Sequence, residues 1–277
     1  MPAKQLDDKI YYQFCVFLEQ QCGIVLGEKK QYLVKSRLTP LMVKFSIASL
    51  TELVARALTP AERQLRAAVI DAMTTNETLW FRDEYPFQLL KNKVLPELTG
   101  RKNPIRIWSA ASSSGQEPYS IAMAALEYQQ SQPGAFPGGI EVIATDISAT
   151  MLEHCQYGHY DNLALGRGLS QARKQQFFEA GDNGMLKIKD QVKNMVSFRP
   201  LNLLNNYSLL GRFDIVFCRN VLIYFSPEIK AKIISQVHST LYNKGYLFLG
   251  ASESLSGVNQ NFSMIRCSPG IVYQKKS

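Results

Sequence analysis

The feature that most constrains the fold of this chain is a regular alternation of strand-like and helix-like segments after Arg101. Short apolar runs typical of buried strands occur at residues 105–108, 140–144, 213–218 and 245–249. Segments with helical character separate them, at residues 118–128, 149–156 and 227–241. Strands that alternate with helices favour a parallel α/β sheet. A hairpin around Ser268-Pro269-Gly270 is predicted to complete this sheet.

The first seventy residues show helical periodicity and no strand pattern. Apolar residues recur on one helical face from Ile10 to Leu18, and Gly23 is suited to end that helix. A second, basic helix is predicted over residues 28–44, with a kink or break caused by Pro40.

Two further short helices are expected before residue 74. One begins near Ser49, and the other begins at Thr59, where Thr59-Pro60-Ala61-Glu62 has the pattern of a capping box. We therefore predict a small all-α domain over residues 1–73 and an α/β domain over residues 74–277. A small β insertion is predicted at about residues 160–198, because β-like runs at 186–188 and 196–198 interrupt the alternation.

Composition excludes several classes of protein. Hydrophobic residues make up 46% and charged residues 19% of the 277-residue chain, which is a globular composition. No run approaches the ~18 apolar residues of a membrane span, and the N-terminus has no signal-peptide pattern, so a cytoplasmic protein is expected. Five dispersed cysteines and three histidines form no metal motif, so we expect no metal. The net charge of +8 favours an acidic partner.

Ligands of open α/β sheets bind beyond the carboxyl ends of the strands, and the turn at residues 109–122 follows the first strand. Its small residues allow a ligand to approach the backbone, but Gly115 is the only glycine, so a pyrophosphate site is disfavoured. Glu117 would repel phosphate and would suit a cationic group. Alternatively, Glu117 only complements the dipole of the helix that begins there.

Three other segments are candidates. Asp146 ends the second strand and could accept the hydroxyls of a ribose or merely cap the next helix. Residues 218–225 place Arg219 (a candidate anion ligand), Asn220 and Tyr224 after the third strand, or form a structural aromatic loop. Residues 74–87 are either part of the site or a hinge helix with an apolar core face.

These segments together resemble one family closely, the chemotaxis receptor glutamate methyltransferases of the CheR family. The matching runs are NETLWFRD (76–83), WSAASSSGQEPYSIAM (108–123), ATDIS (144–148), RPLNLL (199–204), FDIVFCRNVLIYF (213–225), GYLFLGASES (245–254) and, nearer the N-terminus, GIVLGEKKQYLVKSRL (23–38). The resemblance implies an all-α domain followed by a Rossmann-like domain that binds S-adenosylmethionine (SAM). It also implies methylation of chemoreceptor glutamates, with S-adenosylhomocysteine (SAH) as product.

The resemblance also implies roles for particular residues. Cofactor contacts fall on Asn76, Thr78, Arg82, Glu117, Asp146, Asn202, Leu203, Arg219 and Asn220. Asp146 would bind the ribose and Asn202-Leu203 would flank the adenine, while Arg82 and Tyr224, the candidate catalytic residues, would lie near the methyl group. Trp80 stands where the family usually has phenylalanine, which changes one wall of the pocket.

Further expectations concern the acceptor protein. Lys35, Arg37 and Lys44 are candidates for docking the acidic methylation segment of a chemoreceptor. The short run at residues 179–184 predicts an enzyme that does not depend on a tethering pentapeptide at the receptor C-terminus. A monomer is expected. The alternatives are a methyltransferase of the same build acting on another protein or a small carboxylic acid, a cofactor-binding sensor, and a nucleic-acid methyltransferase.

Overall fold

The computed structural model describes residues 6–257 and 261–277, so the first five residues of the N-terminal segment considered above lie outside it. The chain divides into two compact units. The first contains the described residues up to Thr75 together with Tyr224–Ile229, and the second contains Asn76–Ile223 and Lys230–Ser277. Within the described residues, no helix is long and apolar enough to cross a membrane.

The first unit is helical. Its helices are α1 (Asp8–Cys22), α2 (Gln31–Lys44), α3 (Leu50–Leu58) and α4 (Arg63–Met73). Phe14, Leu18, Leu38, Leu53 and Val69 are fully buried, as the helical periodicity predicts. The first helix ends at Gly23, which adopts the left-handed conformation that a glycine C-cap permits.

Two details of this unit differ from the sequence prediction. Helix α2 continues without a break through Pro40, because the proline removes only one backbone donor on an exposed stretch where water can satisfy the carbonyl. The predicted capping box is wrong. Thr59 ends α3 instead, and the carboxylate of Glu62 accepts a hydrogen bond from Arg56 (2.9 Å), so α4 begins only at Arg63.

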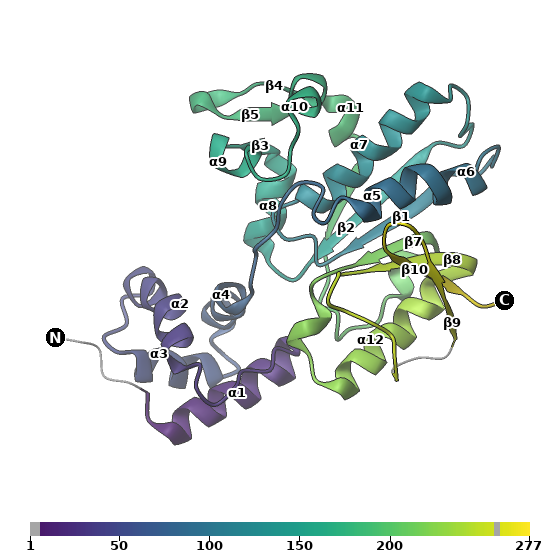
Figure 1. Cartoon of the computed structure of the whole chain (residues 1–277). Helices are drawn as coiled ribbons and strands as arrows, with labels where there is room; N and C mark the ends of the chain where they lie inside the picture. The colour runs from purple at the N-terminus through teal and green to yellow at the C-terminus, as the bar shows by residue number, and fades with distance from the viewer. Residues whose placement is uncertain (1–5, 258–260) are drawn as a thin grey trace. The chain divides into compact units, whose positions relative to one another are not determined.

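The second unit is built on a seven-stranded sheet in the order β6-β2-β1-β7-β8-β10-β9 (Figure 1). Its strands are β1 (Ile105–Ala110), β2 (Ile140–Asp146), β6 (Val196–Pro200), β7 (Phe213–Cys218), β8 (Leu241–Leu249), β9 (Phe262–Arg266) and β10 (Ile271–Lys275). The first five strands in the order are parallel, and the β9–β10 hairpin is antiparallel, as predicted. Every residue of β7 is buried, which is typical of a central parallel strand.

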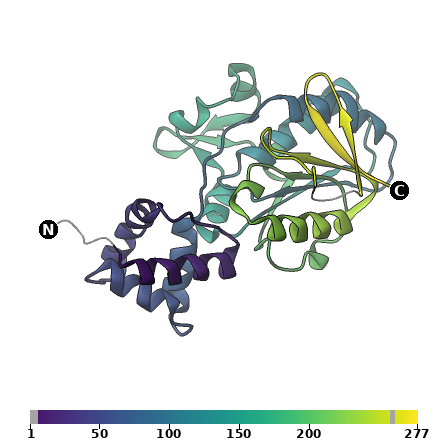
Figure 2. The same ribbon diagram turned by 60° about the horizontal axis from the view of Figure 1, so that its bottom comes forward.

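Helices cover both faces of this sheet. One face carries α7 (Gln116–Ser131), α8 (Ala149–Tyr157) and the run formed by α5 (Tyr85–Leu89), the π-helical turn η1 (Leu90–Val94) and α6 (Leu95–Glu97). The other face carries α12 (Pro227–Thr240), as Figures 1 and 2 show. This two-sided arrangement is the doubly wound α/β architecture that the alternating pattern predicts.

A small three-stranded sheet interrupts the chain between α8 and β6. It has the order β3-β5-β4, with β3 (His159–Tyr160), β4 (Phe178–Ala180) and β5 (Leu186–Ile188). The short elements α9 (Asn162–Leu165), α10 (Gln171–Phe177), η2 (Asp182–Gly184) and α11 (Asp190–Lys193) connect these strands and lead to β6. The predicted insertion included Val196–Phe198, but that run is the edge strand of the main sheet, where Val196 pairs with Val142. Two short 3₁₀ turns, η3 (Ser208–Leu210) and η4 (Leu222–Tyr224), flank β7.

Candidate functional site

The carboxyl ends of β1 and β7 form the point where the strand order reverses. From β1 the chain builds outward through β2 to β6, and from β7 it builds in the opposite direction to β8. The region outside these strand ends, where ligands of open α/β sheets bind, is here called the crevice. The predicted cofactor residues of the second unit lie at the carboxyl ends of β1, β2, β6 and β7 and on residues 76–84.

The turn between β1 and α7 has a strained backbone. Ala111 and Ser113 have φ angles of 57° and 50°, which L-residues rarely adopt, and Gly115 has a φ of 93°. A Cβ on Gly115 would lie 2.8 Å from the Tyr160 hydroxyl and 2.9 Å from the Cys155 sulfur. That hydroxyl donates to the carbonyl of Ser114 (2.7 Å). The surrounding side chains thus hold the turn in a conformation that is unfavourable for its residues by themselves.

Asp146 connects this turn to the end of β2. Its Oδ2 accepts a hydrogen bond from the Ser113 backbone N–H (2.7 Å), and its Oδ1 accepts one from Ser148 N–H (2.9 Å). The side chain of Ser148, not Asp146, caps helix α8 by accepting from Met151 N–H. The alternative that Asp146 is only the helix cap is therefore wrong. Asp146 is 5% exposed and is the last residue of β2.

Glu117 and Arg219 form a buried ion pair. The Oε2 of Glu117 lies 3.2 Å from Nη1 of Arg219, and its Oε1 accepts from the Ser109 hydroxyl (2.8 Å). Burial raises the pKa of Glu117, and the Arg219 charge opposes that rise. Glu117 is thus more than a partner of the helix dipole, because its carboxylate faces the strand ends.

The guanidinium of Arg219 is already engaged by the protein. Its Nη2 lies 2.6 Å from the Asp83 carboxylate and donates to the carbonyl of Arg82 (3.0 Å), and the side chain is 0% exposed. The expected free anion-binding arginine is therefore a buried arginine between two carboxylates. Only its Nε has no hydrogen-bond partner within the described residues.

The segment at residues 76–84 crosses the β1–α7 turn without forming the alternative hinge helix. The carbonyl of Asn76 accepts from the Ser113 hydroxyl (2.8 Å), and Phe81 N–H donates to Ser120 Oγ (3.0 Å). Phe81, Asp83 and Glu84 all have positive φ angles, so a regular helix cannot form there. The same tethers position Thr78 and Arg82, and Arg82 donates to the carbonyl of Glu77 (3.2 Å).

Trp80 does not form a pocket wall. Its ring is fully buried and packs edge-on against Tyr160 (4.9 Å between centroids) and Phe178 (5.4 Å) of the inserted region. The departure from the usual phenylalanine therefore changes the packing of the insertion.

The adenine candidates Asn202 and Leu203 follow β6. Leu201 N–H donates to the carbonyl of Asp146 (2.9 Å), which ties this loop to the end of β2. The side-chain oxygen of Asn202 accepts from Leu204 N–H (3.0 Å), and Leu203 is 7% exposed. The structure therefore brings these two residues to the same edge of the sheet as Asp146.

Asn220 lies in the loop after β7, in a strained backbone conformation that Glu253 holds. Its φ is 57°, and its backbone N–H donates to Glu253 Oε2 (2.8 Å). Glu253 was not among the candidate residues, although it lies in the GYLFLGASES run, four residues after β8 ends. An acidic side chain just beyond a parallel strand was the signal that could have identified it.

The remaining candidates belong to the first unit. The carbonyl of Tyr224 accepts from Val25 N–H (2.9 Å), which anchors residues 224–229 in that unit. Arg37 donates to the carbonyls of Met73 (2.6 Å) and Thr74 (2.9 Å), so it satisfies the C-terminal end of α4. Lys35 and Lys44 lie on the same helix as Arg37, and Lys44 is exposed.

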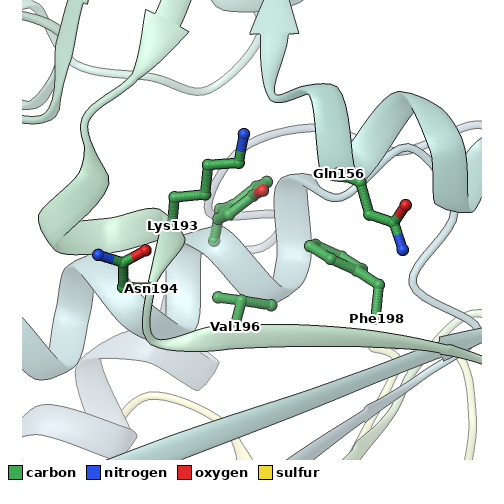
Figure 3. A pocket seen from close by; sticks show the side chains of 6 residues that line it. Gln156, Lys193, Asn194, Val196 and Phe198 are labelled. Atoms are coloured by element: carbon green, nitrogen blue, oxygen red, sulfur yellow. The ribbon is translucent and has the colours of Figure 1, made fainter.

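A separate open hollow of about 440 Å³ lies beside the edge strand β6. Figure 3 shows Val196 and Phe198 along the strand, with Gln156 and Lys193 at opposite sides. None of the predicted site residues lines it. The hollow is therefore distinct from the crevice at the ends of β1 and β7.

Comparison with known proteins identifies the family. Residues 76–271 match the model of the CheR methyltransferase SAM-binding domain, and residues 10–74 match that of the CheR methyltransferase all-alpha domain. The chain belongs to the CheR methyltransferase family. The two matches meet where the compact units divide, between Thr75 and Asn76.

Named relatives match over nearly the full length. A chemotaxis protein methyltransferase 1 of Vibrio cholerae is 59% identical over 276 residues, covering 100% of both chains. A chemotaxis protein methyltransferase 1 of Pseudomonas aeruginosa is 54% identical, covering 95% of this chain and 96% of its own. The chemotaxis protein methyltransferase of Escherichia coli is 32% identical, covering 94% and 89%. This CheR-family chain is therefore a SAM-dependent methyltransferase of chemotaxis.

The crevice fits SAM, the cofactor of the family. Two buried polar atoms there, Ser112 Oγ and Arg219 Nε, have no hydrogen-bond partner within the described residues, so a polar ligand can supply the missing hydrogen bonds. The carboxylates of Glu117 and Asp146 suit a cofactor that carries a sulfonium and an ammonium and no phosphate. No cluster of three metal-ligating side chains occurs in the described part of the chain.

Proposed function

We propose that this CheR-family enzyme methylates glutamate side chains of chemoreceptors, giving glutamate methyl esters. The observation that carries the proposal is the set of charged side chains at the ends of the parallel strands, where hydrogen bonds within the protein hold Glu117, Arg219 and Asp146. The family and its named relatives support the acceptor class.

The cofactor is proposed to lie across the strand ends. Asp146, fixed by two backbone N–H groups, would accept the ribose hydroxyls, and Asn202-Leu203 would flank the adenine. Glu117 would bind the ammonium, because its buried carboxylate lies beside Ser109 and Arg219 at the strand ends, and a cation there would offset the burial that raises its pKa.

Asn76, Thr78, Arg82 and Asn220 would complete the wall around the reacting groups. When bound, SAM supplies a methyl group that passes to a carboxylate oxygen, while the electron pair of the broken S–C bond stays on sulfur. The acceptor glutamate is already ionised at neutral pH, since its ordinary pKa is about 4.3. No general base is needed, and alignment of the two reactants can supply roughly 7–11 kcal/mol.

Arg82 and Tyr224 remain our candidates for residues near the transferred methyl. Arg82 is half-buried, and its guanidinium donates a hydrogen bond to the Glu77 carbonyl. Its charge would orient the incoming carboxylate, and the Tyr224 ring would exclude water from the reacting atoms.

The test uses methyl-tritiated SAM with chemoreceptor cytoplasmic fragments, and it counts the label that base releases as volatile methanol. We expect base-labile label on the receptor with the wild-type protein and at least tenfold less with Asp146→Asn at a limiting SAM concentration. Asp182→Asn, the same change on an exposed loop, is the matched control. Failure to label any receptor, despite SAH binding, would favour another acceptor or a sensor role.

Two finer properties of the enzyme are also proposed. The connection between β4 and β5 is short, with one 3₁₀ turn at Asp182–Gly184, and this supports a pentapeptide-independent enzyme. We expect no binding of a receptor-derived tethering pentapeptide at micromolar concentration in calorimetry, and measurable binding would refute this subtype. We further propose a cytoplasmic monomer, which light scattering of the purified protein would test for its oligomeric state.

A further inference from the structure

Glu253 is an acidic residue at the crevice to which the reaction above gives no role. It follows β8 in a tight turn in which Glu253 N–H donates to the Gly250 carbonyl (2.9 Å). β7 and β8 are parallel neighbours, and Cys218 pairs with Leu249 at their carboxyl ends. Glu253 therefore lies beside the loop that begins with Arg219 and Asn220.

The carboxylate of Glu253 accepts three backbone N–H groups. Oε2 accepts from Asn220 (2.8 Å) and from Gly250 (2.8 Å), and Oε1 accepts from Ile223 (3.3 Å). Two of these donors belong to the β7 loop and one to the end of β8. A single side chain thus fixes both ends of residues 220–223 against the neighbouring strand.

The loop that Glu253 holds is strained at its first residue. Asn220 has a φ of 57°, so its conformation depends on the surrounding contacts. The packing is also tight, because a Cβ on Gly250 would lie 2.8 Å from Glu253 Oε2 and 2.8 Å from Asn220 Nδ2. The absence of a side chain at Gly250 is what allows the carboxylate and the asparagine to approach.

We propose that Glu253 is a positioning residue for methyl transfer, which holds Asn220 in the conformation that binds SAM. The proposal rests on the proposed function, since it takes Asn220 as a cofactor contact. The negative charge of Glu253 also adds to the rise in the pKa of Glu117, which is caused mainly by burial and is opposed by Arg219. The two carboxylates follow β8 and β1, so both lie at carboxyl ends of the parallel strands.

Glu253→Gln tests this role in the full-length protein. The amide presents an NH₂ group where the carboxylate accepts N–H groups, so at least one acceptor is lost while the volume is kept. We expect the KM for SAM and the Kd for SAH to rise about tenfold, with kcat at saturating SAM within about twofold of wild type. Glu153→Gln, the same change at an exposed glutamate of α8, should leave all three values unchanged.

Gly250→Ala provides a second route to the same contact. Its Cβ would push Glu253 and Asn220 apart, and Gly250 does not have a positive φ that would itself disfavour alanine. The single variants should weaken SAH binding similarly, and the double variant should be no weaker than the worse single one. If Glu253→Gln fails to fold, Gly250→Ala decides the question alone.

The outcomes separate the two proposals. A melting temperature lowered with an unchanged KM and Kd in both variants would show a merely structural role and overturn the inference. Wild-type protein that binds SAH but labels no receptor would defeat the proposed acceptor, and the SAH affinities of the variants would still judge Glu253. A tenfold loss of SAH affinity in both variants supports the role of Glu253 in either case.

Discussion

At the scale of single residues, backbone strain is concentrated at the ends of the parallel strands. Of the nine non-glycine residues with positive φ in the described chain, six lie on the crevice loops or on the segment that crosses them: Phe81, Asp83, Glu84, Ala111, Ser113 and Asn220. Each such conformation costs of order 1–3 kcal/mol and persists only where neighbouring contacts enforce it. We therefore expect ligand affinity to depend on residues that hold these loops without touching the ligand.

Gly115 allows a test of that expectation with a matched control. Gly115→Ala and Gly134→Ala both place alanine at a positive φ, 93° and 78°, so each should cost about 1–2 kcal/mol of stability. Only the Cβ at residue 115 would meet other atoms, at Tyr160 and Cys155. SAH titration should show at least a tenfold weaker Kd for Gly115→Ala and wild-type affinity for Gly134→Ala. Equal affinities would mean that the turn adapts freely.

The residue types at the strand ends could be read from the sequence, but their hydrogen-bond and ion-pair partners could not. An acid at the end of β2 and an acid in the first turn of α7 are both visible in the sequence. The enclosure of Arg219 between Glu117 and Asp83 depends on contacts across 102 and 136 residues of chain, which periodicity does not encode. The hydrogen bonds of Glu253 to Asn220 and Ile223 could not be predicted for the same reason.

At the scale of elements, Glu127 of α7 joins two other segments. Its carboxylate contacts Lys91 of η1 (2.6 Å) and Arg173 of α10 (2.6 Å), and the Arg173 guanidinium lies 3.5 Å from the centre of the Phe81 ring. Burial alone would raise the pKa of Glu127, but the hydrogen bonds and charges of the two cations outweigh it and lower the pKa. Glu127 thus ties the insertion to α7 and η1, and it holds the arginine that packs on Phe81.

Glu127→Gln should therefore destabilise the enzyme in a pH-dependent way. Because the pKa of Glu127 is lower in the folded state, the carboxylate stabilises the fold fully above the pKa of the unfolded state, about 4.3. This stabilisation is lost as the pH falls through the lower pKa of the folded state. We expect the free energy of unfolding, measured in urea, to be about 1–2 kcal/mol lower for the variant than for the wild type at pH 7. This difference should become smaller below about pH 4.3. Glu153→Gln is the control, and a difference that grows on acidification would contradict the sign.

Elements with a strong local signal were predicted correctly, and elements set by distant partners were not. The buried runs of β1, β2, β7 and β8 and the final hairpin are as the apolar pattern indicated. β6 was assigned to the wrong sheet, because the whole insertion separates it in sequence from β2, the strand with which it pairs. The capping box predicted at Thr59 is not formed, because the Glu62 carboxylate is paired with Arg56.

At the scale of the whole molecule, the helical unit is proposed to recognise the acceptor, and the α/β unit to bind the cofactor. Arg37 has a structural role at the end of α4, and the other two proposed docking residues, Lys35 and Lys44, lie on α2. The chain carries a formal net charge of +8, so attraction to an acidic receptor segment should contribute mainly to the association rate.

Reversing these two charges should separate docking from cofactor binding. Lys35→Glu combined with Lys44→Glu should lower kcat/KM for the receptor about tenfold at low ionic strength, with a smaller difference at high salt. The Kd for SAH should not change. Lys9→Glu combined with Lys102→Glu, at two exposed lysines outside α2, is the control for the same change in net charge. A uniform effect of both variants would argue for a long-range field and against docking by α2.

The most direct test of the central claim is to locate the methyl group on the acceptor. Chemoreceptor cytoplasmic fragments would be incubated with SAM and either the wild-type enzyme or Asp146→Asn, and peptides would be mapped by mass spectrometry. We predict methyl esters on particular glutamates with the wild-type enzyme only, and their loss when those glutamates are replaced by alanine. Methylation at other atoms, or none on receptors from an enzyme that binds SAH, would contradict the assignment of receptor glutamates as the acceptor.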